Sequence, residues 1–336
     1  MIDTVSSKAD TAAIDIVYLW VDGADPAWQA RRAQAYAGWQ HAAPDQLALH
    51  GNVAGRYRDN GELRYNLRAL ERFFPGHGHI YLVTDRQAPA WLRDAASLEG
   101  CLSIVDHASL MPASALPVFD SGHIESYLHH IAGLSERFIY LNDDVFFGAP
   151  FEPALWFGQG EGGTLAAFTE SGNAAPEASL RADVAAPVNC ATLSRHWLSS
   201  QYGNYKHQPC LYSHAPRPLM KSRLHELEAL APALFAGVRK SVFRSWQAPA
   251  LLPDLVPRWM VHMGYAREQV LDPLYIATGE ADAPLQMDSL LSRFGSLPFF
   301  CINDTCDDAA DDDPRLRRVA ATLQQLLPQP SSFERV

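Results

Sequence analysis

The first half of the chain alternates short, continuous runs of apolar residues with longer segments of helical periodicity. The clearest runs, at 14–21, 80–84 and 138–141, are rich in β-branched and aromatic residues. Such runs are typical of strands that are buried on both faces. Between 61 and 74, leucines and phenylalanines recur at spacings of three and four, which predicts an amphipathic helix. Strands that alternate with helices predict a mostly parallel α/β sheet of Rossmann type, flanked by helices.

The second half has a less regular pattern, and we expect irregular C-terminal additions to the sheet there. Gln159–Pro187 is rich in Gly, Ala and Glu, which predicts a loop or hairpin excursion over the sheet. The acidic run at 307–313 is expected to be a solvated segment. Further helices are expected from Pro26 onward and at Ile124–Leu134, Ala191–Ser200, Leu219–Leu230, Pro257–Tyr265 and Pro314–Leu327.

Acidic residues follow three of the expected strands directly. Asp22 follows the first run, Asp85 the second, and the pair Asp143 and Asp144 the third. Because ligands of parallel α/β sheets bind at the carboxyl ends of the strands, these acids are expected to share one crevice. Two adjacent carboxylates repel each other, and oxygen ligands suit Mg²⁺ or Mn²⁺. The alternative for the pair is a solvated Asn-Asp turn.

Basic and imidazole side chains supply candidate partners for an anion. Four arginines lie between Arg56 and Arg68, and the planar guanidinium group suits phosphate. The alternative is a capped helix with surface ion pairs. His123 precedes an expected helix, whereas His207 lies near Pro209, which makes a helix-interior position improbable for it. His207 is therefore the preferred candidate for a general base, with His123 as its rival.

Composition narrows the range of functions. The 336 residues carry a net charge of −11 without a basic run, which argues against nucleic acid as a partner. The five cysteines lack CxxC spacing and are expected to be free thiols. No stretch approaches the ~20 apolar residues of a membrane span. We therefore expect a cytoplasmic protein, with peripheral association at the inner membrane face. The motifs GxxxxGK[ST], GxGxxG and GxSxG are absent.

Taken in order, these segments resemble the Stealth family of sugar-1-phosphate transferases. The resemblance covers a single catalytic domain at 14–306, with 307–336 as an acidic segment and C-terminal helix. Its conserved regions match at about 14–26, 56–148, 207–244 and 299–305. One departure is Cys210–Arg217, which separates the His207 motif from the segment leading to Lys221 and bears on acceptor contacts. The resemblance implies a GT-A-like variant of the Rossmann-type sheet.

The resemblance also implies the reaction and its partners. A hexose-1-phosphate, commonly GlcNAc-1-phosphate, would pass from a UDP-sugar to a hydroxyl of a glycan or polysaccharide acceptor. UMP would leave, in capsular or exopolysaccharide synthesis, with association with the capsule machinery. The open alternatives are a metal-dependent glycosyltransferase that releases UDP and a non-enzymatic glycan-binding module.

The implied site has three parts. Asp304 is expected either to orient the catalytic histidine or to join the metal ligands, and both options remain open. The expected catalytic residues are His207, Asp144, Arg244 and His123; the metal ligands are Asp143, Asp144 and Asp304; and the residues that bind the nucleotide sugar are Asp22, Arg56, Arg58, Asp59, Glu62, Arg64, Glu125, Lys221 and Asn303.

Overall fold

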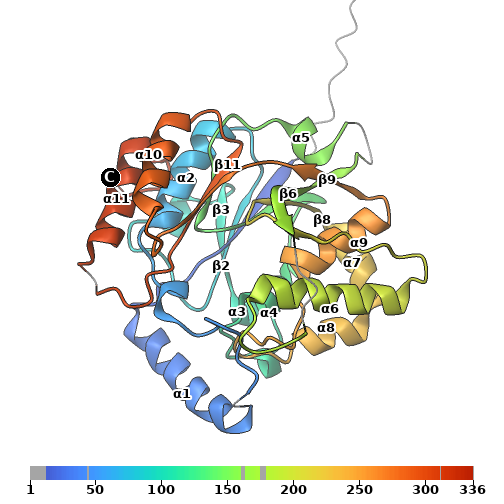
Figure 1. Ribbon diagram of the computed structural model, residues 1–336. Helices are drawn as coiled ribbons and strands as arrows, with labels where there is room; N and C mark the ends of the chain where they lie inside the picture. Colours follow the sequence, from blue (N-terminus) through green and yellow to red (C-terminus); the bar gives the residue numbers. More distant parts are fainter. Residues whose placement is uncertain (1–12, 44, 160–162, 175–178, 311, 336) are drawn as a thin grey trace, which may run out of the picture.

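A five-stranded sheet forms the centre of the molecule in the computed structural model, which describes residues 13–43, 45–159, 163–174, 179–310 and 312–335 (Figure 1). Its strand order is β3-β2-β1-β4-β8. The first four strands are parallel, and β8 pairs antiparallel with β4. The prediction of a Rossmann-type, mostly parallel sheet is confirmed. The strands are β1 (Ile14–Leu19), β2 (Ile80–Thr84), β3 (Leu102–Asp106), β4 (Arg137–Asn142) and β8 (Arg217–Met220).

Two three-stranded sheets extend this centre. The first has the order β10-β11-β5 and the second the order β7-β6-β9. In the first, β11 pairs antiparallel with β5, the strand that follows β4 after a tight turn. The strands are β5 (Val145–Phe147), β6 (Leu165–Ala174), β7 (Cys210–Tyr212), β9 (Ala266–Val270), β10 (Leu274–Ala277) and β11 (Phe299–Asn303).

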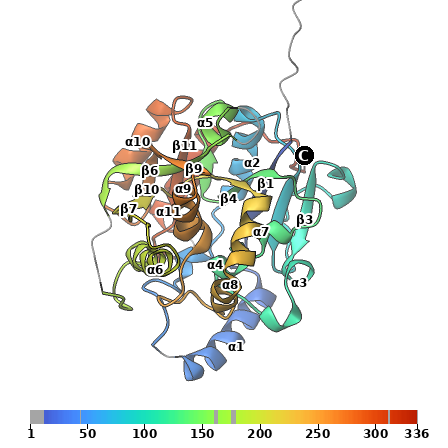
Figure 2. The same ribbon diagram turned by 90° about the vertical axis from the view of Figure 1, so that its right-hand side faces the viewer.

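Two groups of helices lie on opposite sides of the sheets in Figure 1. One group contains α2, α10 and α11, and the other contains α6 to α9, which Figure 2 shows from the front. None of the helices in the described part of the chain is both long and apolar enough to cross a lipid bilayer. The helices are α1 (Pro26–Ala42), α2 (Glu62–Phe73), α3 (His107–Leu110), α4 (Ser121–Glu125), α5 (Pro153–Phe157), α6 (Ala186–Gln201), α7 (Lys221–Leu230), α8 (Pro232–Val238), α9 (Val256–His262), α10 (Ala283–Arg293) and α11 (Pro314–Leu326).

Three expected elements differ from the structure. The helix expected at Ile124–Leu134 is replaced by α4 and a separate 3-10 turn at Leu128–His130. The Ser126 carbonyl accepts a 2.6 Å bond from Arg239, and the His130 N–H bonds the Tyr127 carbonyl at 2.8 Å, so the α-helical pattern stops there.

The expected loop or hairpin at 159–187 contains the strand β6, which lies between β7 and β9. The first part of this strand has few β-branched residues, and Leu165–Thr169 are buried by tertiary packing that the sequence pattern does not mark. Similarly, the first two residues of the helix expected at Leu219–Leu230 belong to β8, and α7 begins at Lys221.

The C-terminal segment packs against α2. Arg68 of α2 donates from Nε to Glu334 at 2.6 Å and from Nη2 at 2.8 Å, and both side chains are buried. Burial alone would raise the pKa of Glu334, but hydrogen bonds from Arg68 and the Ser331 amide lower it to about 2. Arg64 also pairs with Glu334. The last residues are therefore integrated with the core.

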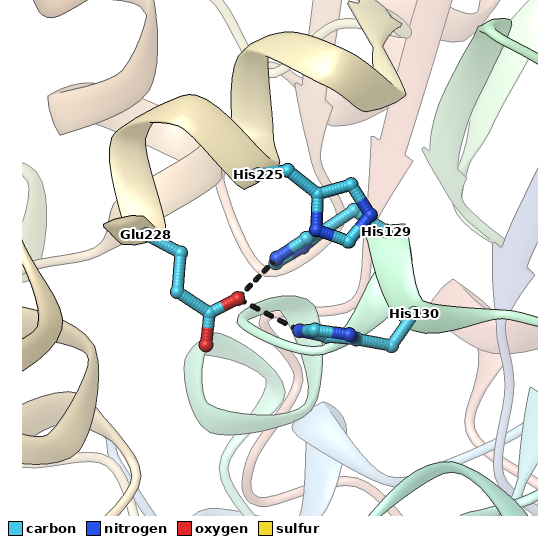
Figure 3. Close-up of side chains that lie close together, drawn as sticks. All are labelled: His129, His130, His225 and Glu228. Carbon is cyan, nitrogen blue, oxygen red and sulfur yellow. Dashed lines mark hydrogen bonds and ion pairs between the residues drawn. The ribbon is translucent and has the colours of Figure 1, made fainter. Parts of the chain in front are cut away.

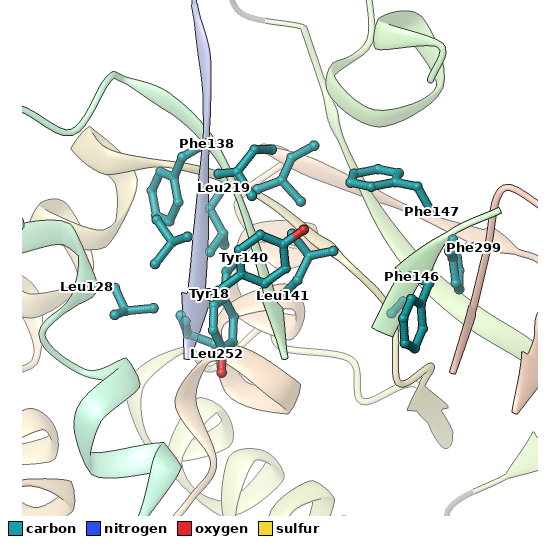
Figure 4. Close-up of a cluster of buried hydrophobic side chains, with 14 of the residues drawn as sticks. Tyr18, Leu128, Phe138, Tyr140, Leu141, Phe146, Phe147, Leu219, Leu252 and Phe299 are labelled. Carbon is teal, nitrogen blue, oxygen red and sulfur yellow. The ribbon is translucent and has the colours of Figure 1, made fainter. Parts of the chain in front are cut away.

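Aromatic side chains fill the space between the central sheet and the β5–β11 pair (Figure 4). Tyr18, Phe138 and Tyr140 lie on β1 and β4, and Phe146 stacks on Phe300 with ring centroids 4.9 Å apart. This packing fixes the turn between β4 and β5, which carries the acidic pair.

Candidate active site

A cleft of about 1020 Å³ opens at the carboxyl edge of the central sheet. Asp85, Asp143 and Asp144 line it, as expected of acids at the ends of parallel strands. Asp22 is not among its lining residues, and its carboxylate accepts a 2.8 Å bond from the Ala24 amide within the turn after β1. The volume is at the upper end of the range for small-molecule sites.

A buried amide holds the turn that carries the acidic pair. Asn66 of α2 donates from Nδ2 to the carbonyl oxygens of Asp143, at 2.9 Å, and Val145, at 2.5 Å. Its Oδ1 accepts a 2.7 Å bond from the Tyr18 hydroxyl of β1. Both side chains are fully buried. The turn is thus attached to a helix and a strand and cannot shift without breaking buried hydrogen bonds.

The carboxylates around Asp143 carry uncompensated negative charge. Burial raises the pKa of Asp143 well above its ordinary value, and the neighbouring carboxylates of Glu62, Asp144 and Asp59 raise it further. Burial likewise raises the pKa of Glu62 to about 8. The main causes of both shifts are burial, neighbouring carboxylates and hydrogen bonds, and no arginine is among them. A divalent cation would relieve this repulsion, so the donor set fits the expected Mg²⁺ or Mn²⁺.

Asp144 also has close partners that are not carboxylates. Nε2 of His214 lies 3.3 Å from its Oδ1, and the Cys301 thiol donates to its Oδ2 at 3.6 Å. Burial and Asp144 raise the pKa of the Cys301 thiol well above its ordinary value, so it remains a protonated donor. His214 and Asp144 both line the cleft and are partly exposed. This imidazole is therefore accessible to a ligand.

Two arginines in the cleft have no carboxylate partner among the described residues. Arg56 and Arg244 line the cleft, and Nη2 of Arg244 donates to the Ser121 hydroxyl at 3.0 Å. Burial, and then the charge of Arg244, lower the pKa of Arg56 to about 10. The Nε atom of Arg56 is buried without a hydrogen-bond partner. Two guanidinium groups that repel each other and form no ion pair among the described residues are suited to bind an anion.

The other expected binding residues in the cleft are already paired. Nη1 of Arg58 donates to Asp304 Oδ2 at 2.6 Å, and Asp304 Oδ1 accepts from the Cys306 amide at 2.9 Å. Asn303 donates to the Tyr275 hydroxyl at 2.6 Å. Asp304 thus serves Arg58 and the local turn in this structure. Arg58, Asn303, Asp304, Glu62 and Glu125 all line the cleft.

Glu125 lies at the junction of α4 and the central sheet. It is buried, and burial is the main cause of its raised pKa. The Tyr140 hydroxyl lies 2.9 Å from Glu125 and 2.6 Å from Oδ1 of Asn142. Arg217 also lines the cleft, and its charge counteracts the rise in the Glu125 pKa.

Five further expected site residues are not among those that line the cleft. Asp59 accepts hydrogen bonds from the Gly61 amide and the Trp20 indole. Nζ of Lys221 donates to the Leu134 carbonyl at 3.3 Å, and Arg64 pairs with Glu334. His123 contacts the Ser241 carbonyl through Nδ1 at 2.7 Å, and burial lowers its pKa. His207 lies 3.1 Å from the Tyr205 hydroxyl.

His214 and Arg217 are cleft residues that the sequence analysis did not assign a role. They lie in Cys210–Arg217, the segment interpreted as a departure from the family pattern. Arg217 pairs with Tyr140 in the antiparallel β4–β8 register, so the residues just before it lie beside the end of β4. The only sequence signal for a role of these two residues was a polar segment directly before an apolar strand. That signal places them in the cleft only if β8 is known to run antiparallel to β4.

The fold and the cleft define an α/β protein of Rossmann type with a large cleft at the carboxyl edge of its sheet, where ligands of such folds bind. Three family models match this chain: Stealth conserved region 1 at 13–37, region 2 at 56–164 and region 4 at 292–336. The chain belongs to the Stealth protein family, and the resemblance is confirmed. The third region, expected at 207–244, stays a prediction.

Curated relatives match nearly the whole length of this chain. The exopolysaccharide phosphotransferase SCO6023 of Streptomyces coelicolor is 39% identical over 96% of this chain and 52% of its own length. The exopolysaccharide phosphotransferase CpsY of Mycobacterium tuberculosis is 30% identical over 96% of this chain and 58% of its own length. This chain thus spans about half the length of these relatives.

Similarity to solved structures is low. The galactosyltransferase LgtC, in complex with donor and acceptor sugar analogues, has a TM-score of 0.41 and 11% identity, with 94% of this chain and 98% of that chain covered. No inference is drawn from this likeness.

Proposed function

We propose that this protein is a phosphotransferase that moves a sugar-1-phosphate group from a UDP-sugar to a hydroxyl of a glycan acceptor. The reaction would serve exopolysaccharide or capsule synthesis on the cytoplasmic side of the membrane. One observation carries the proposal: a single cleft contains two arginines that form no ion pair among the described residues and an acidic pair whose mutual repulsion a divalent cation would relieve. The relatives' names, exopolysaccharide phosphotransferase, support it.

Arg56 and Arg244 would bind the pyrophosphate of the donor. Their lack of a carboxylate partner means that binding breaks no existing ion pair, and charge-assisted hydrogen bonds to phosphate are strong. A divalent cation held by Asp143 and Asp144 would neutralise the pyrophosphate and polarise its phosphoryl oxygens. Glu62, whose pKa is about 8, would lose its proton more readily beside such a cation.

Three histidines compete for the role of general base. We favour His214 because its Nε2 lies 3.3 Å from Asp144 and the residue lines the cleft. Asp144 would stabilise the imidazolium that forms when the ring takes a proton. The ring of His123 is bound to the Ser241 carbonyl, and Nε2 of this residue is buried without a partner. His207 contacts Tyr205.

The bonds made and broken follow from these roles. Nδ1 of His214, the ring nitrogen that does not face Asp144, would remove the proton from the acceptor hydroxyl as the hydroxyl oxygen attacks the phosphorus that carries the sugar. The bond between that phosphorus and the bridging oxygen would break, and UMP would leave with the electron pair. Arg56 and Arg244 would stabilise the charge that develops on the phosphoryl oxygens. GlcNAc-1-phosphate is the transferred group that we would test first.

Product analysis tests the proposal. The protein is incubated with a panel of UDP-sugars, Mg²⁺ or Mn²⁺ and a capsule-like acceptor, and the products are followed by ³¹P NMR. UMP together with a phosphodiester signal is the expected result. Release of UDP would instead indicate glycosyl transfer at the anomeric carbon, and glycan binding without turnover would indicate a binding module.

Matched histidine variants test the assignment of the base. His214→Ala is expected to lower the transfer rate ~10²–10⁴-fold while donor binding is retained. His207→Ala and His123→Ala are the comparison variants, measured at equal folded fractions. Full activity of His214→Ala together with an inactive His207→Ala would return the role to His207.

A further inference from the structure

A second cluster of metal-ligating side chains lies outside the cleft. Its members are His129 and His130, on the 3-10 turn after α4, and His225 and Glu228, on α7 (Figure 3). None of the four lines the cleft. His225 and Glu228 are three residues apart on one helix and therefore share a face. The expectations drawn from the sequence gave no role to any of these residues.

The four side chains converge on one point. One ligand atom from each lies within 4.8 Å of the other three. Nε2 of His129 and Nε2 of His130 lie 2.6 Å and 2.7 Å from the same oxygen, Oε2 of Glu228. Figure 3 shows the ring of His225 beside the other two imidazoles, with centroids 4.7 Å and 5.1 Å away. Ligands of a tetrahedral ion with bonds of ~2.0–2.1 Å are ~3.3 Å apart, so small adjustments would suffice.

Neutral imidazole and ionised carboxylate are the forms that bind metal. Nε2 of His129 and Nε2 of His130 face the same carboxylate oxygen, so in the metal-bound form the ring proton of each would lie on Nδ1.

Arg239 orients the carboxylate for this role. It pairs with Oε1 of Glu228, which leaves Oε2 facing the imidazoles. Its own position is fixed because Nε donates to the Ser126 hydroxyl at 3.0 Å and the guanidinium lies 3.8 Å from the centroid of the Tyr127 ring. Metal ligands are commonly held by such outer partners, which fix their direction.

His225 shows that the cluster is more than a hydrogen-bonded network. Oε2 of Glu228 already accepts from the other two imidazoles, and no hydrogen bond of the His225 ring occurs among the described residues. A network that only joined the 3-10 turn to α7 would not need a third imidazole at this point. A metal ion would use all three.

We propose that His129, His130, His225 and Glu228 form a site for Zn²⁺ or a chemically similar divalent transition metal. Three nitrogen ligands and one oxygen ligand favour such an ion over Mg²⁺. The ion would join α7 to the 3-10 turn that follows α4, and α4 contributes Ser121 and Glu125 to the cleft wall. His130 is 39% exposed and gives the ion a route from solvent. The site is structural and independent of the proposed transferase reaction.

Zinc binding is measured on the full chain in an Asp144→Asn background. The background matters because Asp144, His214 and Cys301 form a second group that could bind zinc. The protein is stripped with EDTA, incubated with Zn²⁺ and desalted, and bound metal is counted by mass spectrometry. One zinc per chain and a rise of several degrees in Tm are expected, because a ligand of the folded state stabilises it. Mg²⁺ should produce neither effect.

His225→Ala is the decisive variant because it removes one ligand and leaves the His129–Glu228–His130 hydrogen bonds intact. Its Tm without metal is expected to match that of the background, and the zinc-dependent rise should disappear. His41→Ala, on the exposed face of α1, is the control and should bind zinc normally. X-ray absorption should show only nitrogen and oxygen around the metal. Absence of bound zinc, or undiminished binding by His225→Ala, would overturn the proposal.

Discussion

Replacing Arg244 by glutamine tests whether this residue binds an anion or stabilises the fold. Arg244 lines the cleft, contacts the Ser121 hydroxyl at 3.0 Å and has no carboxylate partner among the described residues. Glutamine keeps a hydrogen-bond donor of similar reach but removes the charge. If Arg244 serves to bind phosphate, the variant loses affinity for pyrophosphate and keeps its stability. If Arg244 instead stabilises the fold, both the affinity for pyrophosphate and the free energy of unfolding fall.

The structure sets the size of each effect. The pKa of Arg56 is lowered to about 10, which corresponds to roughly 3 kcal/mol against its charged form. Burial is the larger cause and Arg244 the second, so Arg244→Gln relieves only a part of this free energy. Weakening the Ser121 bond costs about 1 kcal/mol, so the free energy of unfolding should change by less than about 1 kcal/mol.

Binding should respond much more strongly than folding. A hydrogen bond to a charged group contributes about 1.5–3 kcal/mol, so the Kd for pyrophosphate should rise about 10- to 100-fold. Calorimetric titration with pyrophosphate and Mg²⁺ measures the affinity, and urea unfolding measures the stability.

Arg68→Gln is the matched control for this comparison. It breaks the buried pair with Glu334, away from the cleft, and should lose about 3–5 kcal/mol of stability with unchanged affinity. An Arg244→Gln variant that is strongly destabilised and binds pyrophosphate normally would refute the reasoning.

Three further predictions concern the frame of the cleft. Because the pKa of Glu62 is raised to about 8 in the folded state, stability in EDTA should fall as pH rises from about 4.5 to 8, and Glu62→Gln should flatten this dependence of Tm on pH. Tyr18→Phe leaves Oδ1 of buried Asn66 unpaired and should cost about 1–3 kcal/mol in urea unfolding. Gly23→Ala places a Cβ 2.0 Å from the Tyr57 carbonyl oxygen. The substitution should therefore displace the segment that carries Arg56 and weaken pyrophosphate binding in calorimetry.

Local patterns sufficed to predict the acidic pair and much of the fold. The apolar run of β4 and the polar residues that follow it lie within ten positions, and the parallel sheet places strand ends at one edge. Asp143 and Asp144 therefore lie in the cleft as expected. The same reasoning overreached for Asp22, which lies three residues beyond the end of β1, because its carboxylate bonds the Ala24 amide of its own turn.

Contacts between distant segments could not be read from the sequence. Arg64 belongs to the arginine-rich segment, yet it faces Glu334 because α2 turns this side toward the C-terminal tail. His207 and His214 are seven positions apart in similar surroundings, and only the direction of β8 decides which one lies beside Asp144. Sequence periodicity assigns a residue to a strand or helix but does not assign the partner of an edge strand.

The pairing of the strands around the acidic turn explains how segments far apart in sequence form one cleft. β8 runs antiparallel to β4, so the residues before it, including His214, lie next to the end of β4. β11 pairs with β5, and the Ile302 amide donates to the Asp144 carbonyl at 3.0 Å, which brings Asn303 and the following residues to the other side. The acidic turn is thus fixed from both sides by backbone pairing. Substitution of a side chain at this turn can therefore change the chemistry of the cleft, while the paired strands keep the backbone of the turn in place.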